Sequence, residues 1–259
     1  MLSNTEIKYY GSLKHKRFRV AEEKFLIEGF HLVEECMKSS YKLECVIFNE
    51  KTDDEKKEQM LTFLKRKNIP IYETKEKNFK KLKETEHSQG VIGVVVQKKD
   101  LRFDVLANGR LVIALDSIND PGNFGTIIRT AYWFGADCIL SGKGSVDIYN
   151  SKVLRSTQGA IFHSAIHTDV DLPGKLNLLN KNGYSVYLMS QDGNISLKEI
   201  DHFDKTVFVF GNESDGISEA LLKDCFDKVK IDGFSDCESL NVAVSCGIVL
   251  NHYRNIQSG

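Results

Sequence analysis

The chain has 259 residues, of which 41% are hydrophobic, 27% charged and 10% aromatic, and its formal net charge is −1. This length suffices for one or two domains with proper cores, and the composition excludes a disordered, charge-biased tail protein. The longest aliphatic run, residues 91–96, contains Gly93 and leads into a polar stretch, so no segment is suited to cross a membrane. Because no apolar segment near the N-terminus could serve as a signal peptide, we expect a cytoplasmic location.

Cysteine and histidine usage gives no sign of disulfides or metal. The six cysteines form no CxxC pair, and several stand in apolar runs, so we expect reduced thiols. His163 and His167 could share a helix face, but the glutamate of a zinc-protease helix does not stand between them. We therefore expect no metal site.

Charge is distributed unevenly along the chain. Residues 1–100 hold 21 Lys and Arg against 17 Asp and Glu, a balance of +4, and residues 101–259 hold 14 against 19, a balance of −5. The change coincides with a polar stretch between two apolar runs, which is typical of a linker. We therefore predict two domains, over residues 1–100 and 108–259.

Short strands and helices alternate in the first of these domains, as expected for a small α/β domain. A predicted strand ends at 25–29, and further strands are predicted at 45–48, 69–72 and 90–96. The predicted helices are 30–38 and 53–67.

The second domain also alternates, with strand-like apolar runs separated by helical stretches. The runs are 111–116, 138–140, 184–189 and 206–210, and residues 125–134 have apolar side chains at helical spacing. This pattern predicts an α/β fold with a parallel sheet covered by helices on both faces. In such sheets ligands bind where the strands end, so the loops that follow the strands are the candidate site.

The first such loop, residues 116–125, carries a strong turn at residues 120–122 and leads into a helix with Arg129. The guanidinium could reach a phosphate or a carboxylate. On turn chemistry alone, a capped helix with a surface arginine explains the segment better.

The second loop follows the buried run 206–210 and contains two glycines, an amide and two carboxylates over residues 211–216. Glycines allow a ligand to approach the backbone, and Glu213 can accept hydrogen bonds from hydroxyls or amines. The alternative is a tight turn in which Asn212 and Asp215 only satisfy local amides.

The third segment, residues 237–248, reads as a helix with small residues on its inner face. Ser239 is a suitable N-cap, and Asn241 would lie in the first turn, beside the positive end of the helix. Taken alone, this segment is better explained as a capped core helix without further function.

Several well-known motifs are missing. There is no GxSxG and no GxxxxGK[ST] sequence, and the GxGxx stretch 142–147 has Asp147 where a dinucleotide fingerprint needs its third glycine. An oxidoreductase that uses a nicotinamide cofactor is therefore a weak alternative.

Together the three segments resemble the SpoU/TrmH branch of the SPOUT methyltransferases. The resemblance rests on NFGTIIR at 123–129, GNESDG at 211–216 and SLNVA at 239–243, with lesser matches at 155–160, 26–29 and 87–91. It implies methyl transfer from S-adenosylmethionine to a ribose 2′-hydroxyl of RNA, a deep trefoil knot and a homodimer. It also implies that residues 1–100 bind RNA and are similar to kink-turn-binding ribosomal proteins.

The resemblance implies roles for particular residues. Arg129 would act at the 2′-hydroxyl together with a substrate phosphate, and Asn123, Glu213, Ser239 and Asn241 would orient the ribose, Arg129 and the cofactor. The expected cofactor-binding residues are Met189, Gly211, Asn212, Gly216, Ile231 and Leu240. The chain departs from many relatives at 231–233, where it has Ile-Asp-Gly instead of Ile-Pro-Met, and at Ala243, where a serine is common.

Basic side chains alternate with aromatic ones near the N-terminus, which suits phosphate contacts and base stacking. The expected RNA-binding residues are Lys14, Lys16, Arg17 and Arg19, although a solvated amphipathic helix explains this segment equally well by itself.

The separate first domain favours ribosomal RNA of the 23S type over transfer RNA. A transfer-RNA ribose methyltransferase and a non-catalytic RNA-binding or ribosome-assembly protein remain the alternatives. Val244, Ile248 and Val249 are candidates for core or dimer packing.

Overall fold

The computed structural model describes residues 1–52, 54–98, 109–236 and 238–258. They divide into two compact units, residues 1–100 with 149–162 and residues 101–148 with 163–259. The segment Tyr149–Phe162, which we expected in the second domain, therefore groups with the first unit. The domain limits 1–100 and 108–259 stay a prediction.

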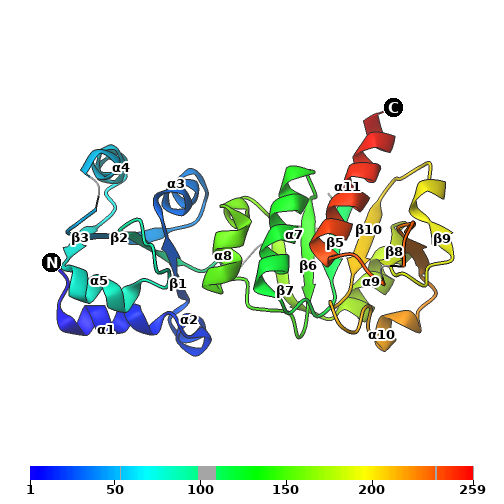
Figure 1. The fold of residues 1–259 in the computed structure, drawn as a ribbon, viewed down its shortest axis with the longest axis horizontal. Coiled ribbons are helices and arrows are strands. Elements are labelled where there is room, and N and C mark those ends of the chain that lie inside the picture. The colour runs from blue at the N-terminus through cyan, green and yellow to red at the C-terminus, as the bar shows by residue number, and fades with distance from the viewer. Residues whose placement is uncertain (53, 99–108, 237, 259) are drawn as a thin grey trace. The chain divides into compact units, whose positions relative to one another are not determined.

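The first unit is a four-stranded sheet with helices, as the alternating pattern predicted (Figure 1). The strand order is β1-β4-β2-β3, in which β2 and β3 are parallel and the other pairs antiparallel. Its strands are β1 (Lys24–Glu28), β2 (Leu43–Asn49), β3 (Ile71–Thr74) and β4 (Val91–Val96). Its helices are α1 (Asn4–Ser12), α2 (Lys16–Glu22), α3 (Phe30–Lys38), α4 (Asp54–Arg66), α5 (Glu76–Leu82), α8 (Ser151–Thr157) and the 3₁₀ turn η1 (Ala160–Phe162).

Aromatic contacts join the segment Tyr149–Phe162 to the rest of this unit. The ring of Tyr149 stacks on Phe25 with centroids 4.2 Å apart, and Phe162 meets Tyr41 edge-on at 5.3 Å. Such pairs bury large apolar surfaces in a defined geometry. The segment is thus an integral part of this unit.

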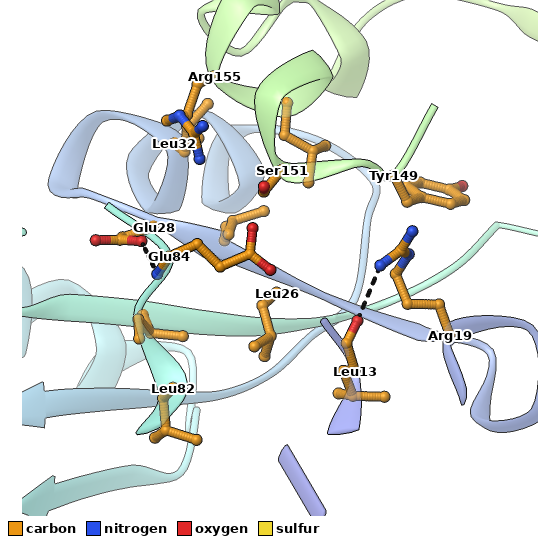
Figure 2. Close-up of a pocket in the computed structure, with 13 residues that line it drawn as sticks. Leu13, Arg19, Leu26, Glu28, Leu32, Leu82, Glu84, Tyr149, Ser151 and Arg155 are labelled. Carbon is orange, nitrogen blue, oxygen red and sulfur yellow. Dashed lines mark hydrogen bonds between the residues drawn. The ribbon is translucent and has the colours of Figure 1, made fainter. Parts of the chain in front are cut away.

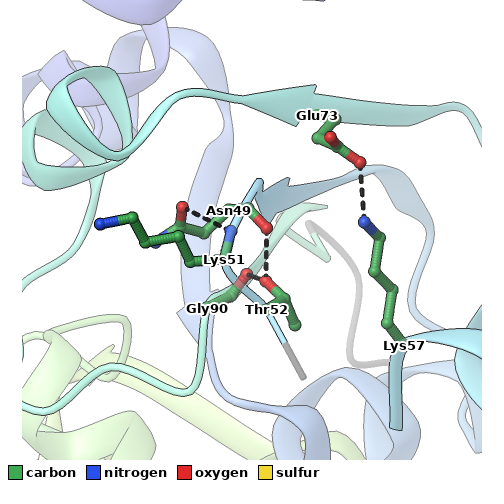
Figure 3. Close-up of polar contacts among 6 residues, drawn as sticks. All are labelled: Asn49, Lys51, Thr52, Lys57, Glu73 and Gly90. Atoms are coloured by element: carbon green, nitrogen blue, oxygen red, sulfur yellow. Dashed lines mark hydrogen bonds and ion pairs between the residues drawn. The ribbon is translucent and has the colours of Figure 1, made fainter. Parts of the chain in front are cut away.

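A buried threonine fixes the loop at the end of β2 (Figure 3). The hydroxyl of Thr52 contacts the carbonyl oxygens of Asn49 and Gly90 at 2.7 and 2.8 Å. Gly90 has a φ of +81°, and a Cβ at this position would lie 2.5 Å from the Thr52 hydroxyl. Only glycine therefore fits at the entry to β4.

The second unit is a seven-stranded parallel sheet in the order β7-β6-β5-β10-β8-β11-β9, which confirms the predicted fold class. Its strands are β5 (Leu111–Leu115), β6 (Cys138–Gly142), β7 (Ile166–Val170), β8 (Ser185–Met189), β9 (Ile195–Ser196), β10 (Thr206–Phe210) and β11 (Asp227–Lys230). Its helices are α7 (Pro121–Trp133), α9 (Leu172–Lys181), η2 (Leu197–Glu199), α10 (Glu219–Leu222) and α11 (Val242–Ser258). The knot, and the likeness of the first unit to kink-turn-binding proteins, stay predictions.

Helices cover both faces of this sheet. On one face, Leu176 of α9 and Leu221 of α10 share a buried cluster with Val207 of β10. On the other, Tyr253 of α11 meets Phe208 of β10 edge-on at 6.1 Å. Because neighbouring residues of a strand point to opposite faces, the apolar run 206–210 serves both layers. Within the part of the chain that the structure describes, no helix combines the length and apolarity that crossing a membrane requires.

Candidate functional site

The candidate loops leave neighbouring strands at one edge of the seven-stranded sheet. The last residues of β5, β10 and β8 stand side by side, with Leu115 opposite Phe210 and Phe210 opposite Met189. Val229 of β11 pairs in turn with Met189. The loops that begin at residues 116, 190, 211 and 231 therefore all emerge at the carboxyl edge, where ligands bind in such sheets.

Side-chain hydrogen bonds join the three motifs at this edge. The amide nitrogen of Asn123 donates to Oε1 of Glu213 at 3.0 Å. The amide nitrogen of Asn241 donates to Oδ1 of Asn123 at 2.9 Å. Three residues that are far apart in the sequence, one from each motif, thus form a connected polar cluster.

Two helices begin at the cluster, and each is capped by a side chain. Asp120 Oδ1 accepts from the backbone nitrogen of Asn123 at 2.8 Å, so α7 begins at Pro121, four residues before the predicted start. Asn241 Oδ1 accepts from the backbone nitrogens of Ala243 and Val244 at 2.9 and 3.3 Å. The positive ends of both helices therefore lie beside the cluster.

The expectation that Ser239 caps the last helix is wrong. Helix α11 begins at Val242, so its cap is Asn241 and Ser239 lies exposed in the preceding loop. The physical reason is that an asparagine side chain caps as well as a serine and stands next to the first helical residue.

Backbone pairing closes the second motif into a tight loop. Asn212 and Gly216 exchange backbone hydrogen bonds of 2.8 and 3.0 Å, and Gly216 has a φ of +70°. A Cβ on Gly211 would lie 2.2 Å from the carbonyl carbon of Gly216. The two glycines are thus required by the backbone itself.

Asn212 also holds this loop through its side chain. Its Oδ1 accepts from the backbone nitrogen of Ser214 at 2.8 Å, and its Nδ2 donates to the carbonyl of Ser117 at 2.7 Å. These bonds agree with the alternative in which the amide satisfies local backbone groups. A cofactor contact of Asn212 stays a prediction.

Sequence reasoning missed Asp116, which ties the first and second motifs together. This carboxylate is 7% exposed, and its Oδ2 accepts from the backbone nitrogen of Ser218 at 2.7 Å. The sequence did contain a signal for this role, because Asp116 directly follows an apolar strand. A carboxylate buried at such a place must accept hydrogen bonds from nearby donors.

Arg129 stands apart from the polar cluster. It lies on α7 six residues after Asn123, which is about 9 Å along the helix axis. Its side chain is exposed, and among the described residues its guanidinium has no hydrogen bond or ion pair. The structure therefore brings together Asn123, Glu213 and Asn241, and leaves Arg129 turned to solvent.

The predicted RNA-binding residues differ sharply in their surroundings. Lys16 and Arg17 are exposed, whereas Arg19 is 6% exposed and donates to the carbonyls of Leu13 and Lys14 at 3.1 and 2.7 Å. Figure 2 shows the Arg19 bond to Leu13 beside a pocket that Arg155 also lines. Lys14 donates to the carbonyl of Lys83 at 2.7 Å, and burial lowers the pKa of its ammonium group. The geometry of Arg19 is that of a structural residue.

The structure gives no support to a shared helix face for His163 and His167. His163 stands in a turn with its ring stacked on Tyr132 at 5.6 Å, and His167 belongs to β7. Across the described ranges no group of three His, Cys, Asp or Glu residues could hold a metal ion. The cysteines that the structure describes, Cys36, Cys45, Cys138, Cys225 and Cys246, are free thiols.

The fold and the site define a class of protein: a two-unit α/β protein whose candidate site is built from loops at the carboxyl edge of a parallel sheet. Residues 110–251 match the SpoU rRNA Methylase family, and residues 4–93 match the MRM3-like substrate binding domain. The chain belongs to the SpoU rRNA methylase family. This confirms the predicted family and enzyme class, an RNA methyltransferase.

Relatives and solved structures match the chain over nearly its whole length. The 23S rRNA (guanosine(2553)-2'-O)-methyltransferase RlmP of Bacillus subtilis is 33% identical over 97% of this chain and 96% of its own. The 23S rRNA (guanosine-2'-O-)-methyltransferase RlmB of Neisseria meningitidis is 28% identical over 88% and 94%. An rRNA methyltransferase from Sinorhizobium meliloti superposes with a TM-score of 0.85 at 26% identity, covering 98% of this chain and 96% of that one.

A second structure described as an rRNA methyltransferase from Sinorhizobium meliloti, with AdoMet bound, gives a TM-score of 0.84 at 24% identity over 98% and 96% of the two chains. This likeness shows that the chain has the fold of that protein.

Proposed function

We propose that this protein methylates a ribose 2′-hydroxyl of 23S-type ribosomal RNA. The observation that carries the proposal is the Asn123–Glu213–Asn241 cluster, which unites the three motifs at the carboxyl edge of the sheet. The full-length match to relatives named as 23S rRNA 2'-O-methyltransferases supports the choice of substrate. Ribosomal RNA as substrate agrees with a cytoplasmic location.

The residues at the edge fit S-adenosylmethionine. The neighbouring ends of β10, β8 and β11 offer backbone groups at Gly211, Met189 and Ile231, which suit adenine and ribose. Gly216 and Gly233 border open space, since a Cβ at either would meet no atom within 4 Å. Asn212 and Leu240 complete the proposed cofactor-binding set. When bound, this cofactor supplies an activated methyl group on a sulfonium.

The protein's own contribution is positioning and charge stabilisation. Arg129 would bind a substrate phosphate and stabilise negative charge that develops on the ribose oxygen, because a guanidinium is always protonated and cannot serve as a base. Asn123, which is itself held by Asn241, holds the carboxylate of Glu213 in place, so that it can accept hydrogen bonds from hydroxyls of the ribose. Ser239, which is exposed in the loop that precedes α11, would help to orient the ribose.

The test is methyl transfer from labelled S-adenosylmethionine to RNA from cells that lack the gene, followed by mapping of the 2′-O-methyl positions. We expect label in 23S-type ribosomal RNA at a ribose. Label confined to transfer RNA would overturn the substrate, and the absence of label with every RNA fraction would favour a non-catalytic RNA-binding protein.

We further propose a homodimer through the exposed apolar face of α7 and α11. Val249 is fully buried and belongs to the core, whereas Val244 and Ile248 are 52% and 39% exposed. Trp133, at the end of α7, is 83% exposed, and Arg254 of α11 donates to the neighbouring carbonyl of Phe134 at 2.6 Å. Exposed apolar side chains gathered on two packed helices are typical of an interface between copies.

Analytical ultracentrifugation tests the dimer. We expect Ile248→Asp to sediment as a monomer and Leu178→Asp, which changes a leucine 43% exposed on α9, to remain a dimer. A monomeric wild-type protein would contradict the proposal.

A further inference from the structure

Asp232, which lies two residues after the end of β11, binds one group of β9 and one of the adjoining 3₁₀ turn η2. The hydroxyl of Ser196 donates to Asp232 Oδ2 at 2.6 Å, and Lys198 Nζ lies 2.8 Å from the same oxygen. Hydrogen bonds from Lys198 and Ser196 lower the pKa of this carboxyl, so it is ionised at neutral pH. Asp232 thus joins two stretches of chain that are far apart in sequence.

The segment that Asp232 binds is itself held firmly against the sheet. The backbone nitrogen of Ser196 donates to Glu199 Oε2 at 3.0 Å, and the backbone nitrogen of Ser190 donates to the carbonyl of Val229 at 2.9 Å. A Cβ on Gly193 would lie 2.6 Å from the backbone nitrogen of Lys230, so this turn packs directly on β11. The two partners of Asp232 therefore belong to a fixed part of the unit.

The second stretch that Asp232 joins is the loop that starts at Ile231. Residues 233–236 and 238–240 are all exposed, and the loop ends at Asn241, which is bound to Asn123. Asp232 consequently fixes the beginning of this loop, as Asn241 fixes its end. Ile231 and Leu240, which stand at the two ends of the loop, belong to the proposed cofactor-binding set.

We propose that Asp232 is a positioning residue for S-adenosylmethionine, which it serves by tying the loop of residues 231–240 to Ser196 and Lys198. The inference rests on the proposed function. It predicts that loss of the carboxylate weakens cofactor binding and leaves the chemical step intact, because among the described residues Asp232 bonds to Ser196 and Lys198 and not to the Asn123–Glu213–Asn241 cluster. An ion pair that is partly exposed contributes little by itself, so the effect must come through the order of the loop.

The experiment measures S-adenosylhomocysteine binding by calorimetry and methyl-transfer kinetics on the full-length protein. We expect Asp232→Ala to raise the Kd for S-adenosylhomocysteine and the KM for S-adenosylmethionine about tenfold, a loss of ~1.4 kcal/mol. The kcat at saturating cofactor should stay within about twofold of wild type. Asp232→Asn keeps an acceptor for Ser196, so its Kd for S-adenosylhomocysteine should lie between those of wild type and Asp232→Ala. The Kd of Lys198→Ala should lie in the same range.

Lys223→Ala is the matched control, because Lys223 is also an exposed lysine next to a carboxylate, 3.7 Å from Glu219, and lies outside the proposed site. It should bind like wild type. Equal binding by wild type and Asp232→Ala would overturn the inference, as would a fall in kcat at saturation without a change in KM. Failure of the wild-type protein to bind S-adenosylhomocysteine would instead refute the proposed function. If Asp232→Ala does not fold, Ser196→Ala provides the same comparison.

Discussion

The side-chain amide of Asn123 donates a hydrogen bond of 3.0 Å to the carboxylate of Glu213, although 90 positions separate the two residues. The orientation of the amide is fixed from its other side, because Oδ1 accepts from Asn241 at 2.9 Å. Asn123 can therefore present only its donor to Glu213, which fixes the position of that carboxylate oxygen.

Replacing Asn123 by aspartate should harm activity more than replacing it by alanine. The aspartate would place a second carboxylate against Glu213, and two negative charges at this distance repel each other. We expect kcat/KM for methyl transfer to fall about tenfold in Asn123→Ala and about a hundredfold in Asn123→Asp, whose activity should partly recover at lower pH.

Asn177→Ala is the control for this pair, since Asn177 likewise donates to a carboxylate, that of Asp224, at 3.1 Å. It lies on α9 and should leave kcat/KM unchanged. Wild-type activity in Asn123→Asp would show that the cluster plays no part in the reaction.

Arg129→Ala should abolish methyl transfer while cofactor binding persists. The guanidinium is exposed and takes no part in the bonds that hold the loops, so its removal leaves the site's framework intact. We expect a fall in kcat of at least about a hundredfold, in line with loss of a group that stabilises developing charge. Arg129→Lys should recover little, because an ammonium cannot bind phosphate in the bidentate manner. The readouts are labelled methyl transfer and calorimetry with S-adenosylhomocysteine, and undiminished turnover would refute the role.

Much of the fold was accessible from sequence because apolar runs dictate buried elements. The parallel sheet followed from runs such as 206–210, all of whose residues are buried, and the helix 30–38 was predicted with the bounds that the structure gives to α3. Strands β7 and β11 were missed, since their sequences, IHTDV and DKVK, are largely polar and only partly buried. Such strands form because the sheet beside them offers partners, which a local pattern does not reveal.

The candidate site was accessible in part for a similar reason. Sequence could place Asn123 and Glu213 on loops that leave a sheet and Asn241 near the start of a helix, but their mutual bonds depend on the strand order. Nor could it distinguish Arg19, which is buried and bound to carbonyls, from Arg17, which is exposed on the same short helix. That difference arises because α2 turns one side toward the sheet.

The basic N-terminal segment should therefore respond in two ways to mutation. Lys16→Ala with Arg17→Ala should weaken RNA binding and reduce its salt dependence, since removing a side chain that binds a phosphate lowers the slope by about one. Arg19→Ala should instead lower the free energy of unfolding by about 1–3 kcal/mol, because one buried and one partly buried carbonyl lose a charged donor. Filter binding at several salt concentrations and urea unfolding separate the two effects. A flatter salt dependence in Arg19→Ala with unchanged stability would contradict this division.

The buried thiols should make the protein less stable at alkaline pH. Burial raises the pKa of Cys138 from 9.0 to about 12, so the folded state keeps a proton that the unfolded state releases above pH 9. The unfolded state then binds fewer protons, and the free energy of unfolding falls as the pH rises from about 9 toward 12. Cys138→Ala should be less stable overall, because it leaves a cavity, but its stability should fall less steeply over this range. Cys225→Ala, which changes an exposed thiol, should retain the wild-type slope. Urea unfolding between pH 8 and pH 11 measures the slopes, and equal slopes in all three proteins would rule out a contribution from Cys138.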